Sequence, residues 1–155
     1  MDETRGIEEF GTVNNDPFNL ERFLMAQAGV YAEVLTELAA GMKRSHWMWF
    51  IFPQLKGLGS SAVAHRYGLA SLDEARAYLA HEVLRARLER CTELVIQSQA
   101  PSLRALFGSP DDLKFRSSMT LFAHASDPAD SLYHEALNRW CGGIDDQLTV
   151  SVLNR

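Results

Sequence analysis

The stretch SHWMWFIFPQLKGLG, residues 45–59, holds residue types that could form a binding site. Trp47 and Trp49 offer flat rings for a base or a sugar, and His46, Gln54 and Lys56 supply polar groups around them. The alternative is a core plug, in which the aromatic side chains are buried while His46 and Gln54 satisfy backbone groups. The residue types leave both interpretations open.

Lys56 also begins the segment KGLGSSAVAHRYG, in which glycines and serines precede a short helix expected over about 60–67. Backbone N–H groups at such a helix start could hold an anion, with Lys56 supplying the counter-charge. The spacing matches neither the Walker A motif nor GxGxxG. A glycine-rich helix cap without a ligand explains the same residues.

A second group of candidates lies in DDLKFRSSMTLF, residues 111–122. On a helix Lys114, Ser117, Ser118 and Leu121 share one face, because they are three and four residues apart. Lys114 and Ser118 could bind phosphate or sugar oxygens from this face. Alternatively, the small serines let two helices approach closely while Lys114 extends to water.

Two carboxylates near the C-terminus, in CGGIDDQLTVSVL, follow a pair of glycines that should end a helix. Asp145 or Asp146 could cap the next segment through Thr149. A carboxylate at this point could also act as a general base, and Asp145 is the candidate catalytic residue. The sequence leaves both roles open.

The sequence predicts no metal site and no cofactor. The histidines lack HExxH spacing, and Cys91 and Cys141 show no CxxC or Cys/His ligand pattern. Neither a G-x-S-x-G elbow nor a P-loop occurs, so the common hydrolase and NTPase classes receive no support. The formal net charge of −5 argues against general nucleic-acid binding.

The chain of 155 residues fits a single domain. Residues 1–15 have no hydrophobic period and are expected to form a flexible tail, which leaves 16–155 as the domain. The first residues are acidic and polar, unlike a secretory leader, and no apolar run reaches the roughly 20 residues that cross a membrane. We therefore expect a cytoplasmic protein without a membrane partner.

Apolar residues at steps of three and four indicate an all-α fold. Pairs of a polar residue and proline at 16–17, 109–110 and 127–128, and the S-x-x-E box at 71–74, are typical helix starts. Pro53 prevents the aromatic stretch from continuing as a regular helix. We expect six to eight helices in an irregular bundle or solenoid-like stack. The predicted segments are 20–41 with a break at Gly29, 60–67, 71–79, 84–95, 103–107, 113–121 and 132–140.

Several strings follow one another in the order found in a known family. They are RFLMAQ at 22–27, HWMWFIFPQLKGLGSS at 46–61, EARAYLAHEVLRARL at 74–88, FG at 107–108, LKFRSSMTLF at 113–122 and DDQLT at 145–149. Over about residues 16–153 the chain resembles the domain-of-unknown-function family 1810, small bacterial proteins sometimes labelled calpastatin-like. The resemblance implies an all-α, armadillo-like fold and no stated activity. Nothing in the sequence looks like a disordered protease inhibitor, so that label does not extend to this chain.

A shorter similarity connects VLRARLERCTELV, residues 83–95, with the YbiA-like NADAR group, which acts on ADP-ribose derivatives. The arginines and leucines that carry it are also the composition of an ordinary amphipathic helix.

Two hypotheses about function follow. In the first, the protein binds a phosphorylated, nucleotide-like or ADP-ribose-like small molecule, with Lys56 and Lys114 converging on one cleft beside the Trp47 ring. Whether such a pocket is an enzyme stays open, and Asp145 would orient a water molecule if it were. In the second, a non-catalytic helical module binds a protein partner, which predicts an exposed apolar patch larger than a few hundred Å².

Overall fold

The computed structural model describes residues 16–126 and 131–155, and this part of the chain forms ten α-helices and no β-strand. The predicted tail at 1–15 and the Asp127-Pro128 pair lie outside the described residues. The helices are α2 (Glu21–Ala28), α3 (Tyr31–Ala40), α4 (Met48–Ile51), α5 (Ala62–Tyr67), α6 (Leu72–Ala80), α7 (Glu82–Gln97), α8 (Leu103–Phe107), α9 (Asp111–Ala125), α10 (Leu132–Trp140) and α11 (Gln147–Leu153). The all-α prediction is confirmed, and the short helices α4 and α11 add to the predicted segments.

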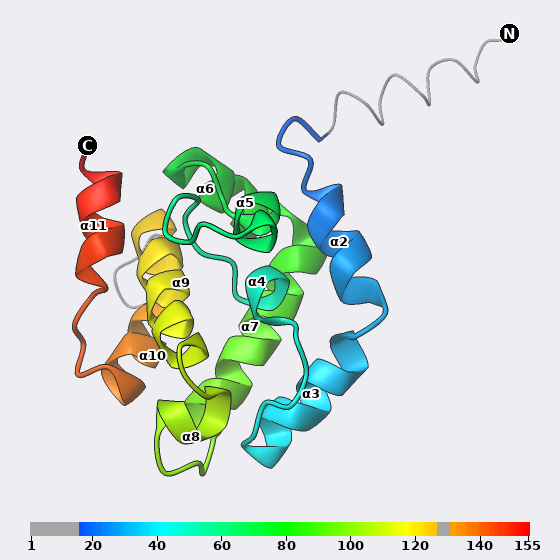
Figure 1. Cartoon of the computed structure of the whole chain (residues 1–155), viewed down its shortest axis with the longest axis vertical. Helices are drawn as coiled ribbons and strands as arrows, with labels where there is room; N and C mark the ends of the chain where they lie inside the picture. The colour runs from blue at the N-terminus through cyan, green and yellow to red at the C-terminus, as the bar shows by residue number, and fades with distance from the viewer. Residues whose placement is uncertain (1–15, 127–130) are drawn as a thin grey trace, which may run out of the picture.

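The long helix α7 runs between two groups of helices (Figure 1). Helices α2 and α3 lie on one side of it, and α9, α10 and α11 lie on the other. Helices α5 and α6 close one end of the molecule, and α8 closes the other. The contacts of α7 with α3, α6 and α10, and of α9 with α6, α8, α10 and α11, join these groups into one domain.

Much of the aromatic stretch at residues 47–52 belongs to the hydrophobic core. Trp47, Met48, Ile51 and Phe52 are each no more than 3% exposed. The Phe52 ring lies edge-to-face against Phe115, with 5.1 Å between the ring centroids. The apolar half of the stretch is therefore a core plug, and α4 within it is limited to a single turn.

Helix boundaries follow the predicted signals at several places. The chain breaks between α2 and α3 at Gly29, and Gly41 ends α3 in the left-handed conformation, with φ of 77°. Ser61 and Ser71 cap α5 and α6 by accepting hydrogen bonds from backbone N–H groups. Asp146 caps α11 in the same way.

Two predicted helix starts are wrong in position. The carboxylate of Asp16 accepts the N–H groups of Leu20 and Glu21, so the Asp16-Pro17 pair forms a turn and α2 begins only at Glu21. Pro110 takes the N-cap position of α9 with a non-helical ψ of 15°, so Ser109 does not cap this helix. No helix in the described ranges 16–126 and 131–155 is long and apolar enough to cross a membrane.

Candidate functional site

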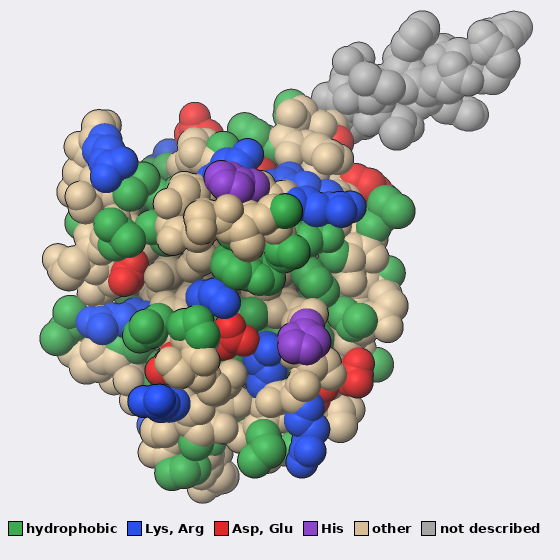
Figure 2. Space-filling view, in the orientation of Figure 1, with side chains coloured by type: hydrophobic (Ala, Val, Ile, Leu, Met, Phe, Trp, Pro, Cys, Tyr) green, Lys and Arg blue, Asp and Glu red, His purple; other side chains and the backbone are tan. Residues whose placement is uncertain are grey.

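A hollow of about 450 Å³ lies between the start of α2, the end of α5 and the start of α6. We call it the basic hollow, because three of its lining side chains are lysine or arginine, whereas only one lining side chain is a carboxylate. Its lining residues are Phe18, Asn19, Arg22, Lys56, His65, Arg66, Gly68 and Glu74. Figure 2 shows basic and histidine side chains gathered over α5 and beside α2. This is a concentration of positive charge in a chain of net charge −5.

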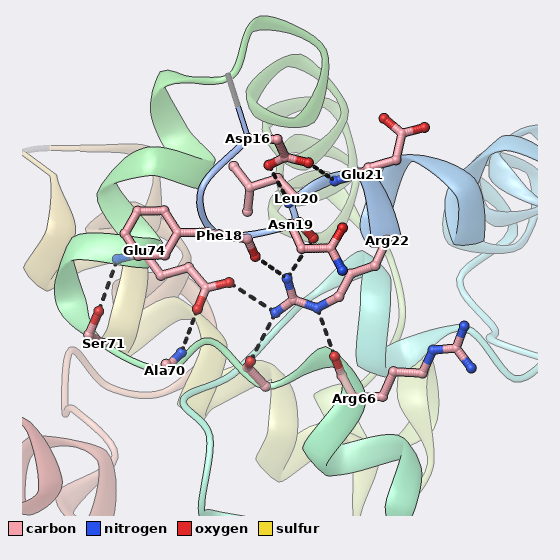
Figure 3. Close-up of polar contacts among 11 residues, drawn as sticks. Asp16, Phe18, Asn19, Leu20, Glu21, Arg22, Arg66, Ala70, Ser71 and Glu74 are labelled. Atoms are coloured by element: carbon pink, nitrogen blue, oxygen red, sulfur yellow. Dashed lines mark hydrogen bonds and ion pairs between the residues drawn. The ribbon is translucent and has the colours of Figure 1, made fainter. Parts of the chain in front are cut away.

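Arg22 lies at the inner side of the basic hollow and is fully engaged by the protein (Figure 3). Its guanidinium donates hydrogen bonds to four backbone carbonyls and forms an ion pair of 2.9 Å with Glu74. The four carbonyls belong to Phe18, Asn19, Arg66 and Gly68. Because all five N–H donors of the guanidinium are used, Arg22 fixes the walls of the hollow and is not available to a ligand.

Glu74 is the buried partner of Arg22, with a side chain only 4% exposed. One of its carboxylate oxygens accepts the backbone N–H of Ala70 at 2.8 Å, and its own N–H donates to the Ser71 hydroxyl at 3.1 Å. The predicted capping box therefore forms in part, since the carboxylate reaches Ala70 and Arg22 instead of the Ser71 N–H. The ion pair connects α2 to the start of α6, and the charge of Arg22 neutralises the Glu74 carboxylate in the hollow.

Lys56 is held in place through its backbone. Its N–H donates to the carbonyl of Leu69 at 2.7 Å, and the N–H of Leu69 donates to the carbonyl of Gln54 at 3.0 Å. Gly68 allows this close approach, because a Cβ atom there would lie 2.8 Å from the Lys56 Cα. The position of Lys56 at the hollow is therefore fixed by the backbone, while its side chain is exposed.

The outer cations of the basic hollow are Lys56 and Arg66, and His65 lies beside them. All three residues are exposed. Within residues 16–126 and 131–155, neither Lys56 nor Arg66 has a carboxylate within ion-pair distance. The Arg66 guanidinium lies 5.6 Å from the centre of the Tyr67 ring. The hollow thus has an inner charge pair that is neutral and an outer rim that carries surplus positive charge.

Lys114 belongs to a different group, which we call the lysine cluster: Lys43, Asp111, Lys114 and the Trp49 ring. Each oxygen of Asp111 lies 2.9 Å from one of the two ammonium groups. The Lys114 ammonium also lies 4.2 Å from the centre of the Trp49 ring. Figure 2 shows blue and red side chains adjoining near the middle of this face. Burial raises the pKa of Asp111, but hydrogen bonds from Lys114 and Lys43 and their charges outweigh it and hold that pKa below its ordinary value.

A buried carboxylate, Glu37, organises the connector between α3 and α4. Its two oxygens accept the N–H groups of Arg44 and Ser45, the Ser45 hydroxyl and the Trp47 indole N–H, at 2.6–3.1 Å. Glu37 is not among the site residues predicted from the sequence, although its position three residues after the apolar Val34 places it on the buried face of α3. A carboxylate on an apolar helix face is the signal that could have identified it.

The predicted site residues therefore lie in several surroundings. Lys56 lines the basic hollow, Lys114 belongs to the lysine cluster, and Trp47 lies in the core with 1% exposure. The Trp47 ring therefore offers no open face, and the ring beside Lys114 is that of Trp49. His46 is exposed at the start of the plug.

Two of the remaining candidates, Gln54 and Ser118, are buried, and Asp145 is partly exposed. Gln54 is 7% exposed, and its backbone carbonyl accepts the N–H of Leu69. Ser118 is fully buried within α9. Asp145 lies 3.1 Å from Nε2 of the exposed His124. No group of three or more metal-ligating side chains occurs among the described residues.

The comparisons with known proteins agree with the fold. A family model described as a protein of unknown function (DUF1810) matches residues 17–153. The chain is 55% identical to the conserved hypothetical protein Rv1873 from Mycobacterium tuberculosis, whose crystal structure it matches with a TM-score of 0.87 over 90% of this chain and 99% of that chain. No curated protein matches the chain, and nothing in these comparisons supports the similarity of residues 83–95 to the NADAR group. The chain belongs to the DUF1810 family.

Proposed function

We propose that the protein binds a small phosphorylated anion in the basic hollow, with Lys56 as its main contact and Arg66 and His65 as further donors. One observation carries the proposal: the hollow of about 450 Å³ has two cations on its rim without a carboxylate partner in the described residues, while Arg22 neutralises Glu74. Nucleotides and sugar phosphates belong to this class of ligand.

The size and the charge of the hollow both support this ligand class. A volume of about 450 Å³ is within the range of sites that bind metabolites, roughly 300–1,000 Å³. A phosphate group carries three oxygens that can accept hydrogen bonds from separate cations, and such charge-assisted bonds are about twice as strong as neutral ones. The inner Arg22–Glu74 pair needs no rearrangement on binding, because its groups already have partners.

We assign ligand binding and no catalytic step to the basic hollow. Asp145, the predicted general base, pairs with His124 and does not line the basic hollow. Lys114 and Ser118 likewise do not line it. The ligand contacts therefore come from the Lys56 half of the predicted site.

Isothermal titration calorimetry with ribose 5-phosphate and pyrophosphate tests the proposal. We expect Lys56→Ala to weaken binding about tenfold, the loss of roughly one charge-assisted hydrogen bond. Lys114→Ala is the matched control, since it removes the same charge from a lysine that is already paired with Asp111, and its affinity should stay within about twofold of the original. Equal losses in both variants, or a loss in Lys114→Ala alone, would reject the basic hollow as the site.

A further inference from the structure

A second hollow adjoins the basic hollow and differs from it in chemistry. It has a volume of about 700 Å³ and lies between α2 and α6. Leu20, Leu24, Ala77 and Ala80 provide its apolar lining, and we call it the apolar groove. Phe18 lines both the apolar groove and the basic hollow, so its ring stands where the two meet.

The charges around the apolar groove have the opposite sign to those of the basic hollow. Asp16 and Glu21 are the acidic residues in its lining. The Asp16 carboxylate already accepts two backbone N–H groups, so it stays in place as a fixed negative group. A second phosphate would be repelled here, whereas an uncharged apolar group would cover the leucine and alanine side chains.

We infer that the ligand is a soluble phosphomonoester with one apolar ring, whose phosphate lies at Lys56 and whose ring passes Phe18 into the apolar groove. This inference rests on the proposed function, since the phosphate end is the same. Phe18 is 36% exposed, and a flat ring can pack against its side chain on the way from one hollow to the other. The acidic lining of the groove and the basic rim of the hollow fix the direction in which such a molecule binds.

Phenyl phosphate and inorganic phosphate are the probes that separate the two ends of the ligand. We expect phenyl phosphate to bind about tenfold more tightly than inorganic phosphate, the order of effect for covering one ring. Ala80→Trp, which fills the groove from the exposed end of α6, should abolish this preference and leave the affinity for inorganic phosphate unchanged. Ala32→Trp, at an exposed alanine of α3, is the matched control. Phe18→Ala is a second variant, and it should reduce the preference in the same direction.

The possible results distinguish the inference from the proposed function. Equal affinity for the two probes, still dependent on Lys56, would overturn the inference and leave the proposed function standing. Binding of neither probe would overturn both. A concentration-dependent dimer that Ala80→Trp abolishes would show that a second copy of the chain covers the groove, and it would also overturn the inference.

Discussion

The lysine cluster and the basic hollow contain the same kinds of side chain and use them differently. In the lysine cluster, both ammonium groups share the two oxygens of Asp111. In the basic hollow, Arg22 takes the carboxylate of Glu74, and the outer Lys56 has no such partner among the described residues. The comparison shows that the charge of Lys114 is already balanced by a carboxylate, whereas the charge of Lys56 is not balanced by one within the described residues.

The largest effect should come from breaking the inner pair of the basic hollow. Arg22→Met would leave the Glu74 carboxylate, 4% exposed, without its cation, and we expect it to lower the free energy of unfolding by about 3–5 kcal/mol. Urea unfolding measures this change. The matched control is Arg76→Met, because Arg76 forms an exposed pair with Asp73 at 3.6 Å and should contribute less than about 1 kcal/mol. Similar losses in the two variants would contradict the assignment of Arg22 to the scaffold.

We expect a smaller loss of unfolding free energy when the lysine cluster is broken than when the Arg22–Glu74 pair is broken. Asp111→Asn removes the charge that faces Lys43, whose side chain is 8% exposed, and should cost about 2–3 kcal/mol. The loss is smaller than for Arg22 because Asp111 is 21% exposed and solvent can take over part of its role. Asp112→Asn, at the next residue of the same helix end, should change stability by less than about 1 kcal/mol. If Asp111→Asn and Asp112→Asn lose the same unfolding free energy, Asp111 stabilises the fold no more than a surface carboxylate does. The lysine cluster would then not differ from the rim of the basic hollow in how its lysines are held.

The local part of this structure could be predicted from the sequence. The break at Gly29, the cap at Ser71 and the end of α3 at Gly41 depend on residues within one helical turn, and the structure confirms them. The partner of Lys114 is also a local feature, because Asp111 precedes it by three residues on the same helix. The sequence therefore contained evidence that Lys114 is paired.

The surroundings of Lys56 and Trp47 could not be predicted in the same way. The basic hollow depends on hydrogen bonds that Arg22 donates to Arg66, Gly68 and Glu74. These partners follow Arg22 in the chain by 44, 46 and 52 positions. Such contacts form only when α2, α5 and α6 have packed together, and no pattern of spacing records them. Trp47 is buried for a related reason, since its ring packs against Phe52 and also against Phe107, which is sixty positions away. The stretch SHWMWFIFPQ alone therefore left both a buried and an open Trp47 ring as alternatives, and the packing of Phe107 against that ring belongs to the buried one.

Glu37 differs from both groups, because its buried carboxylate is held by hydrogen bonds from Arg44, Ser45 and Trp47. Burial raises the pKa of Glu37, but the hydrogen bonds from Ser45, Arg44 and Trp47 outweigh it and lower that pKa from 4.5 to about 2. Glu37→Gln keeps an oxygen for three of the four donors and loses the negative charge, so we expect a loss of about 1–2 kcal/mol at neutral pH. Glu135→Gln, at an exposed glutamate of α10, is the control.

The loss of unfolding free energy in Glu37→Gln can arise from the missing negative charge or from the shape of the amide. Its pH dependence distinguishes these two causes. A carboxylate whose pKa is lower in the folded state stabilises the protein fully above its ordinary pKa, and this contribution falls as the pH decreases from about 4.5 to about 2. The difference in unfolding free energy between the original protein and Glu37→Gln should therefore be largest above pH 5 and should shrink over that range. A difference that stays constant down to pH 2 would mean that the cost arises from the shape of the amide. The connector between α3 and α4 would then depend on packing around Trp47 and not on the charge of Glu37.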